Sequence, residues 1–243
     1  MKVDDAYGRM ILDALEGADI AEIVERDDGF MMASSFGPAA YLAPFKRWPA
    51  RQRRAMRLAR GRVLDVGAGG GRVALHLQER GHEVVAIDRS PGVVEVCRRR
   101  GVRDARELAL DDVEPALGPF DTVVMFGNNL GLLGGKTKSR RVLRLLHDVT
   151  SERARILGET TDPTRTEDPE HLAYHQRNRR RGRLPGHLRI RIRYRELATP
   201  WFDYLFVSAA ELEELLSATG WRLARTLEDK GGTYVAVLEK TTA

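Results

Sequence analysis

The feature that most constrains this chain is a glycine-rich turn that follows a short apolar stretch. Residues 63–66, Val-Leu-Asp-Val, have the mostly apolar pattern of a buried strand, and the turn Gly67-x-Gly69-x-Gly71 comes directly after them. Glycines leave no Cβ where backbone must approach a ligand. A second apolar stretch, residues 83–87, ends at Asp88. A carboxylate at that end of the next strand can accept both hydroxyls of a ribose, so the pattern predicts a nucleotide-cofactor site.

The spacing of the glycines favours one cofactor class over another. In a dinucleotide-binding turn the third glycine falls where this chain has Arg72, so a nicotinamide cofactor fits poorly. Gly67-x-Gly69-x-Gly71, with Asp65 two residues ahead of it, resembles motif I of the class I S-adenosylmethionine-dependent methyltransferases. The resemblance implies S-adenosyl-L-methionine as cofactor, with Asp65 near its methionyl amino group and Asp88 on its ribose. A glycine turn that serves only packing is the alternative.

The same resemblance implies further contacts with the cofactor. The family places an acid and a backbone amide against the adenine at the end of the third strand, and the end of the fourth strand lies beside the methyl group. Aromatic residues ahead of motif I cover the ligand in related enzymes. The expected cofactor-binding residues are Tyr41, Asp65, Gly67, Ala68, Gly69, Gly71, Asp88, Arg89, Leu110, Asp111, Asp112, Phe126 and Gly127. For Arg89 and residues 110–112, solvated turn positions are the alternative.

Strand and helix patterns alternate from residue 62 onward, which is typical of a parallel sheet covered on both faces. The predicted strands are 63–66, 83–87, 103–109, 120–126, 153–159, 221–228 and 233–239, and the predicted helices are 72–80, 91–100, 137–149 and 209–218. With the resemblance, this order predicts an α/β fold: a Rossmann-like, doubly wound, mostly parallel seven-stranded sheet with an antiparallel last strand. An N-terminal helical cap and an inserted β-hairpin lid are expected in addition.

Two segments lie outside this core, and we expect them to cover the site. The expected organisation is a cap or lid segment over 1–59, a cofactor-binding core over 60–160, a substrate-lid insertion over 161–207 and a C-terminal completion over 208–243. The first segment predicts a helix over 4–16, a hairpin over 20–33 and an aromatic loop over 34–48 in which Trp48 joins the core. The insertion predicts a hairpin of strands 188–196 and 201–207.

One face of that inserted hairpin is cationic. Arg189, Arg191, Arg193 and Arg195 alternate with apolar residues along the first predicted strand. Guanidinium groups bind carboxylates and phosphates in a bidentate manner. A face of this kind that is merely solvated is the alternative.

The end of the fourth predicted strand carries the expected acceptor site. Gly127-Asn128-Asn129-Leu130 resembles the Gly-Asn-Ser segment of small-molecule N-methyltransferases related to the glycine N-methyltransferase group, in which the asparagine contacts the substrate. An asparagine bonded to its own turn is the alternative. The Pro-Pro turn of enzymes that methylate exocyclic amines of DNA or glutamine is missing.

Methyl transfer from a sulfonium is an in-line displacement, and a hydroxyl acceptor needs a base whereas a neutral amine does not. Asn128, Tyr174 and His175 are the expected catalytic residues. His171, Glu159 and Tyr204 are further candidates for a base.

Composition limits the partners and the chemistry. The formal charge is +5, and the 40 basic residues are interspersed with 35 acids, so we expect a small-molecule substrate and no nucleic acid or membrane. The single cysteine, Cys97, excludes a thiolate metal site, and no metal is expected. Without a signal-peptide pattern we expect a cytoplasmic protein. The oligomeric state stays open between a monomer and a homodimer.

The prediction is a class I methyltransferase acting on nitrogen or oxygen of a metabolite or natural product. Methylation of RNA or protein is the first alternative, supported by the arginine-rich residues 175–195. A non-catalytic S-adenosylmethionine-binding protein is the second alternative.

Overall fold

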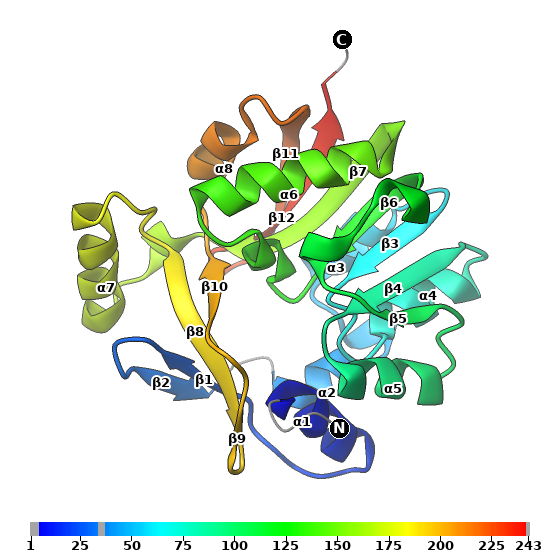
Figure 1. Cartoon of the computed structure of the whole chain (residues 1–243), viewed down its shortest axis with the longest axis horizontal. Helices are drawn as coiled ribbons and strands as arrows, with labels where there is room; N and C mark the ends of the chain where they lie inside the picture. The colour runs from blue at the N-terminus through cyan, green and yellow to red at the C-terminus, as the bar shows by residue number, and fades with distance from the viewer. Residues whose placement is uncertain (1–4, 34–36, 242–243) are drawn as a thin grey trace. The chain divides into compact units, whose positions relative to one another are not determined.

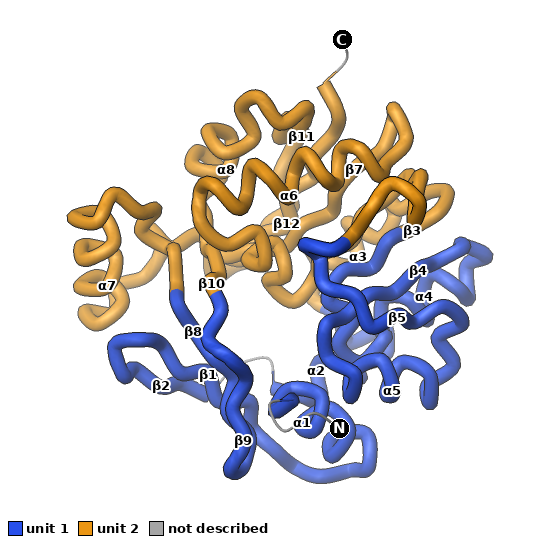
Figure 2. The backbone as a smooth tube through the Cα atoms, viewed as in Figure 1, with its two compact units in different colours: residues 1–48, 64–112, 189–202 blue, residues 49–63, 113–188, 203–243 orange. Residues whose placement is uncertain are grey.

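The computed structural model describes residues 5–33 and 37–241. The chain divides into two compact units, and each takes segments from several parts of the sequence (Figure 2). Unit 1 comprises residues 1–48, 64–112 and 189–202, and unit 2 comprises residues 49–63, 113–188 and 203–243.

A seven-stranded sheet has the order β11-β12-β7-β6-β3-β4-β5 (Figure 1). Its strands are β3 (Val63–Val66), β4 (Val84–Asp88), β5 (Ala105–Glu107), β6 (Phe120–Met125), β7 (Thr150–Thr161), β11 (Trp221–Glu228) and β12 (Thr233–Lys240). β4 and β5 pair in parallel, as do β6 and β7. β12 is antiparallel to both β7 and β11. Every residue of β3 and β4 is buried, as expected for strands covered on both faces. The predicted fold class is confirmed.

The helices that connect these strands begin within one residue of the predicted positions. They are α4 (Arg72–Glu79), α5 (Pro91–Arg99), α6 (Lys136–Asp148) and α8 (Ala209–Leu216). The Ser90 side chain caps α5 by accepting from the backbone N–H of Val93 at 3.0 Å, and proline occupies the first turn. Ser208 and Glu211 form a reciprocal capping box at the start of α8. In unit 2, α8 packs beside α6 (Figure 1).

A second, smaller sheet joins two segments that the sequence analysis treats separately. Its order is β10-β8-β1-β2, and β9 pairs with β8. The strands are β1 (Ile23–Arg26), β2 (Met31–Ala33), β8 (His187–Tyr194), β9 (Leu197–Ala198) and β10 (Phe202–Leu205). The predicted N-terminal hairpin exists, and β1 pairs antiparallel with both β2 and β8. The inserted hairpin is therefore extended by the N-terminal hairpin, with Ile190, Ile192 and Tyr194 buried on one face.

Four more helices lie outside the core pattern. They are α1 (Ala6–Leu15), α2 (Gly37–Leu42), α3 (Ala50–Met56) and α7 (Pro169–Arg180). Short 3-10 helices cover Phe45–Arg47, Leu110–Asp112, Pro115–Leu117, Asn129–Leu133 and Pro163–Arg165. α1 agrees with the predicted helix, for which Asp5 is the N-cap. Within the described chain, no helix is long and apolar enough to cross a membrane.

The expected aromatic loop is wrong in part, and two helices have no counterpart among the predicted elements. Residues 37–42 of the expected loop form α2, and residues 34–36 lie outside the described residues. α3 was not predicted, because its seven residues are too few to show a clear apolar stripe. No helix is predicted over residues 169–180, although Asp168 caps α7 and Pro169 occupies its first position. Trp48 is buried at 2% exposure, as expected.

Candidate functional site

The glycine turn of unit 1 has a backbone that only glycine adopts without strain. Gly67, Gly69 and Gly71 have φ values of +69°, +53° and +73°. The N–H groups of Gly67 and Ala68 donate to the carbonyl of Ile87 at 2.9 and 3.1 Å. The turn that follows β3 is thereby attached to the end of β4, where Asp88 lies.

Asp88 is buried and held by backbone donors. Its carboxylate accepts from the N–H of Ser90 at 3.0 Å and from the N–H of Gly69 at 3.4 Å. Burial raises the pKa of Asp88 to about 6, against the opposing effect of these hydrogen bonds. Asp5 accepts from the Ser90 hydroxyl at 2.7 Å and from the N–H of Gly92 at 2.9 Å. The orientation of the Asp88 carboxylate is therefore determined by the start of α5 and by the glycine turn.

Asp65 has an incomplete set of partners. It is 2% exposed, and no donor in the described part of the chain reaches its Oδ2. Burial raises the pKa of Asp65 to about 7, although the charge of Arg72 favours the ionised form. A buried carboxylate oxygen without a hydrogen bond is costly. An ammonium group of a ligand would supply the missing donor, so this position fits the methionyl amino group that the resemblance assigns to it.

The N-terminal segment covers the glycine turn directly. A Cβ on Gly69 would lie 3.4 Å from the ring of Tyr41, and one on Gly70 would lie 2.2 Å from the Tyr41 carbonyl oxygen. The Tyr41 hydroxyl donates to Glu22 Oε2 at 3.0 Å, and Glu22 is 4% exposed. The rings of Tyr7 and Tyr41 meet edge to face at 5.7 Å. Tyr41 is among the residues expected from the sequence, whereas Tyr7 and Glu22 are not.

The remaining expected cofactor residues have varied environments. Arg89 is exposed, Leu110 is buried, Asp111 is half-buried and Asp112 is exposed. Ala68 and Phe126 are buried at 8% and 5% exposure. Cys97 is buried at 1% exposure.

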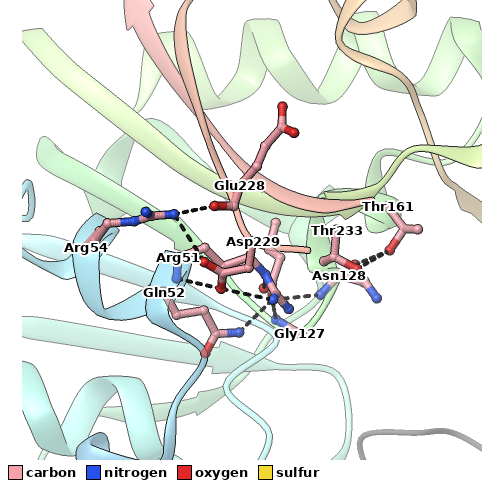
Figure 3. A network of polar contacts seen from close by, with 10 residues as sticks. Arg51, Gln52, Arg54, Gly127, Asn128, Thr161, Glu228, Asp229 and Thr233 are labelled. Carbon is pink, nitrogen blue, oxygen red and sulfur yellow. Dashed lines mark hydrogen bonds and ion pairs between the residues drawn. The ribbon is translucent and has the colours of Figure 1, made fainter. Parts of the chain in front are cut away.

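A polar network in unit 2 holds the turn after β6 (Figure 3). At its centre is Glu159, which is 0% exposed. Arg51 Nε donates to Glu159 Oε1 at 2.7 Å, and Gln52 Nε2 donates to Oε2 at 2.7 Å. The backbone N–H groups of Gly127 and Asn128 also donate to Oε2, at 2.7 and 3.4 Å. Four donors thus occupy the Glu159 carboxylate.

Asp229 extends this network to the turn between β11 and β12. It accepts from the backbone N–H of Arg51 at 2.9 Å and forms ion pairs with Arg51 at 3.4 Å and Arg54 at 3.2 Å. α3, which carries these arginines, therefore links the β11–β12 turn to the end of β7. Neither Arg51 nor Gln52 was singled out from the sequence. Two polar residues at the start of a short helix give no signal of burial, and only the distant Glu159 explains them.

Asn128 is held at several atoms. It adopts the left-handed conformation with φ +63°, which asparagine tolerates better than most residues. The Tyr204 hydroxyl donates to its carbonyl oxygen at 2.6 Å, and the Thr161 hydroxyl donates to its Oδ1 at 3.2 Å. The Tyr204 ring also packs on Gly131, where a Cβ would lie 2.4 Å away. Tyr204 is therefore a support for this turn, in addition to being an expected base candidate.

The other expected catalytic side chains lie on α7 in unit 2. Tyr174 and His175 are buried at 3% and 7% exposure. The Arg177 guanidinium lies over the Tyr174 ring at 4.3 Å. His171 Nδ1 is 3.1 Å from the Thr166 hydroxyl at the start of the same helix. Glu159, Tyr204 and Asn128 are joined by hydrogen bonds. The catalytic role of the three side chains on α7 stays a prediction.

The arginine face of β8 is engaged within unit 1. Arg191 binds Glu25 through two nitrogens at 2.7 and 3.0 Å, and Arg193 pairs with the same carboxylate. Hydrogen bonds from Arg191 and Arg193 lower the pKa of Glu25 to about 2. Arg195 pairs with the buried Asp13 at 2.8 Å. Three of the four alternating arginines, the last of them just beyond β8, therefore bind carboxylates of the chain and not the ligand or solvent expected from the sequence.

The described residues contain no group of three or more His, Cys, Asp or Glu side chains able to hold a metal ion. The arrangement in unit 1 is a turn of backbone amides with two buried carboxylates. The arrangement in unit 2 is a rigid turn that presents an asparagine.

Comparisons with known proteins agree with this geometry. A family model described as a methyltransferase domain matches residues 63–152. The chain is 39% identical over 67 residues to the magnesium-protoporphyrin O-methyltransferase of Rhodobacter capsulatus, a match that covers 26% of this chain and 30% of that protein. It is also 39% identical over 74 residues to the ubiquinone biosynthesis O-methyltransferase of Xylella fastidiosa, covering 27% of this chain and 29% of that protein. The chain thus matches less than a third of the length of these curated relatives.

Solved structures match over far more of the chain. A SAM-dependent methyltransferase from Bacteroides fragilis, in complex with S-adenosyl-L-homocysteine, is 28% identical and superposes with a TM-score of 0.83. That match covers 99% of this chain and 96% of the other. The CcbJ methyltransferase from Streptomyces caelestis is 15% identical with a TM-score of 0.65, covering 98% of this chain and 99% of the other, and shares the fold.

Proposed function

Since the chain belongs to the class I S-adenosylmethionine-dependent methyltransferases, we propose that it transfers a methyl group from S-adenosyl-L-methionine to nitrogen or oxygen of a small-molecule acceptor. The observation that carries this proposal is the buried Asp65 oxygen without a donor beside a turn of three left-handed glycines. The complex of the Bacteroides fragilis relative with S-adenosyl-L-homocysteine supports it.

The residues of unit 1 bind the cofactor in this proposal. S-adenosyl-L-methionine, when bound, supplies a methyl group on a positively charged sulfur. Asp65 accepts a hydrogen bond from the methionyl ammonium, and Asp88 accepts the ribose hydroxyls with its remaining lone pairs. Both carboxylates must be ionised to do this, and their raised pKa values mean that ligand binding favours proton release. Tyr41 excludes water from the glycine turn that it covers.

The residues of unit 2 position the acceptor. An in-line displacement gains most of its rate from a nucleophile that is held in the right direction in a site closed to water. Asn128 lies on a turn whose backbone is bound at Gly127, at its own N–H and at its carbonyl oxygen. A rigid turn of this kind holds a substrate contact with little loss of entropy on binding.

The need for a base depends on the acceptor atom. Glu159 already accepts four hydrogen bonds and pairs with Arg51, so we assign it to holding the turn and not to proton transfer. A neutral amine needs no base. This suits a site in which the buried Glu159 carboxylate is already occupied by four hydrogen bonds. For a hydroxyl acceptor, Tyr174 and His175 stay the candidates.

Methylation of RNA or protein is the less favoured activity. The arginine-rich stretch over residues 175–195 is the feature that favours a polyanionic substrate. Arg191, Arg193 and Arg195 form ion pairs with Glu25 and Asp13, which leaves them less able to bind a polyanion. The names of the two curated relatives describe O-methyltransferases of small molecules, and this supports a small-molecule acceptor here.

The test follows the methyl group. The protein is incubated with methyl-labelled S-adenosylmethionine and, separately, with small-molecule, RNA and protein fractions of a cell extract. We expect label in the small-molecule fraction, and the mass of the labelled compound identifies the acceptor. Asp88→Ala is the control that should lower the transfer when the cofactor is not saturating, because it weakens cofactor binding. Label only in RNA or protein would replace the proposal, and tight cofactor binding without any transfer would indicate a non-catalytic binding protein.

A further inference from the structure

The Asn128 carboxamide has one end bound and one end without a partner. Its Oδ1 accepts from the Thr161 hydroxyl at 3.2 Å (Figure 3). Its Nδ2 donates no hydrogen bond within the described residues, and the side chain is half-buried. An amide with its oxygen bound to the protein presents its NH₂ group to whatever lies beside it. The NH₂ group of Asn128 is thus its unoccupied donor, whereas Oδ1 already accepts one hydrogen bond and keeps a single further lone pair.

A second threonine determines the direction of this hydrogen bond. Thr161 and Thr233 lie opposite each other in the antiparallel pair of β7 and β12. Their Oγ1 atoms are 3.1 Å apart. A hydroxyl has one proton, so when Thr161 donates to Asn128 it must accept from Thr233. The three side chains then form an ordered chain of donors that runs from Thr233 through Thr161 to Asn128.

The backbone of Asn128 cannot turn to relieve this arrangement. Glu159 holds its N–H, and Tyr204 holds its carbonyl oxygen. Both contacts are made with the Asn128 backbone in its left-handed conformation. The carboxamide therefore has only its side-chain torsions to vary, and the Thr161 hydroxyl restrains them.

We propose that Thr161 and Thr233 are positioning residues that present the Asn128 NH₂ group to the acceptor, so that the acceptor carries a lone-pair-bearing oxygen or nitrogen at that point. This inference rests on the proposed methyl transfer, because it assigns the acceptor side of the site to Asn128. Hydroxyl, ether, carbonyl and neutral ring-nitrogen groups satisfy it. An ammonium group does not, since it has no lone pair and would leave the amide donor unmatched.

The test uses two simple probes on the full chain saturated with S-adenosyl-L-homocysteine. Pyridine offers a lone pair, and methylammonium offers only donors. The Asn128 side-chain NH₂ signals are assigned in ¹⁵N-labelled protein as the pair missing from Asn128→Asp. We expect pyridine to shift these signals and methylammonium to leave them in place. In Asn128→Asp, which has only acceptors, methylammonium should bind and pyridine should not.

The threonines are tested by substitutions that keep the shape. Thr161→Val should broaden or double the NH₂ signals and weaken pyridine binding about tenfold, the loss expected for a poorly oriented hydrogen bond. Thr161→Ser should restore both, and Thr226→Val, on β11 in the same unit, is the control that should change neither. Thr233→Val should have a smaller effect in the same direction, because it acts through Thr161.

Two results overturn the inference. Methylammonium shifting the NH₂ signals of the unchanged protein as much as pyridine would mean that the carboxamide is presented the other way round. Neither probe shifting them would mean that Asn128 does not face the acceptor. Calorimetry with S-adenosyl-L-homocysteine is done first on every variant. A protein that does not bind this ligand counts against the proposed function. A protein that binds it but gives the wrong probe response counts against the amide orientation alone.

Discussion

Replacing Glu159 with alanine removes the acceptor that four donors share. Arg51 and Gln52 lose their bonds from α3, and the N–H groups of Gly127 and Asn128 lose theirs. The Arg51 side chain is 8% exposed and the Glu159 side chain 0% exposed, so the pair is shielded from solvent. The substitution therefore leaves a buried cation and several buried donors without their main partner.

The expected loss of stability follows from the burial of this pair. Removing one partner of a buried ion pair costs about 3–5 kcal/mol, because the other charge stays in a poorly solvated place. Asp229 still contacts Arg51 at 3.4 Å and compensates part of its charge. We therefore expect Glu159→Ala to lower the free energy of unfolding by about 3 kcal/mol, the lower end of that range.

Urea unfolding followed by tryptophan fluorescence measures this, since Trp221 of unit 2 is buried at 2% exposure. Glu95→Ala is the matched control: Glu95 pairs with Arg99 at 2.8 Å, but both side chains are about half exposed, at 46% and 50%. An exposed pair contributes little, so this control should lose less than about 1 kcal/mol.

A double substitution tests the cause of the loss. Arg51→Met combined with Glu159→Leu removes both charges, and it should recover part of the stability that Glu159→Ala alone loses. The reasoning is refuted if Glu159→Ala and Glu95→Ala lose the same amount. It is also refuted if the free energy of unfolding of the double variant lies well below that of Glu159→Ala, as it would if the two substitutions acted independently.

Three further predictions concern unit 1. Asp88→Ala should weaken S-adenosyl-L-homocysteine binding at least about tenfold in calorimetry, because a charged hydrogen-bond acceptor for the ribose contributes about 1.5–3 kcal/mol. Unchanged affinity in the folded variant would remove the ribose assignment. The pKa of Asp65 is raised to about 7 in the folded chain, so between about pH 4 and 7 the folded state holds a proton that the unfolded state has lost, and the free energy of unfolding falls as pH rises. Asp65→Asn should make that fall shallower in urea titrations at a series of pH values, and an identical pH profile would contradict the raised pKa. Gly70→Ala should cost about 1–3 kcal/mol of stability, since its Cβ would lie 2.2 Å from the Tyr41 carbonyl oxygen and α2 must move. An unaltered denaturation midpoint would show that α2 does not cover the turn closely.

Local patterns were sufficient for the core of the fold. The apolar runs of β3 and β4, the glycines between β3 and α4, and the capping residues Ser90 and Ser208 each determine structure through neighbours a few residues away. Such signals are present in the sequence itself. The same locality made Asp65 and Asp88 visible as candidates, since each lies at a known distance from the glycine turn.

Contacts between distant segments were not visible in the sequence. β1 pairs with β8 across more than a hundred and fifty residues, with Glu25 opposite Arg191, and neither hairpin alone indicates that partner. In the sequence, Glu25 is one polar residue of an alternating strand. The arginines of the other strand indicate a face that contacts solvent or a ligand. Only the pairing shows that these charges satisfy each other.

The sequence by itself determined the glycine turn, the two carboxylates beside it and the order of the core strands and helices, because backbone conformation and apolar periodicity act over short distances. The tertiary structure decided what surrounds them: that Tyr41 covers the turn, that Glu159 is a buried support, and that Thr161 and Thr233 orient Asn128. Burial and hydrogen-bond direction depend on groups that meet only when the chain is folded, so the role of these side chains could not be read from their residue types.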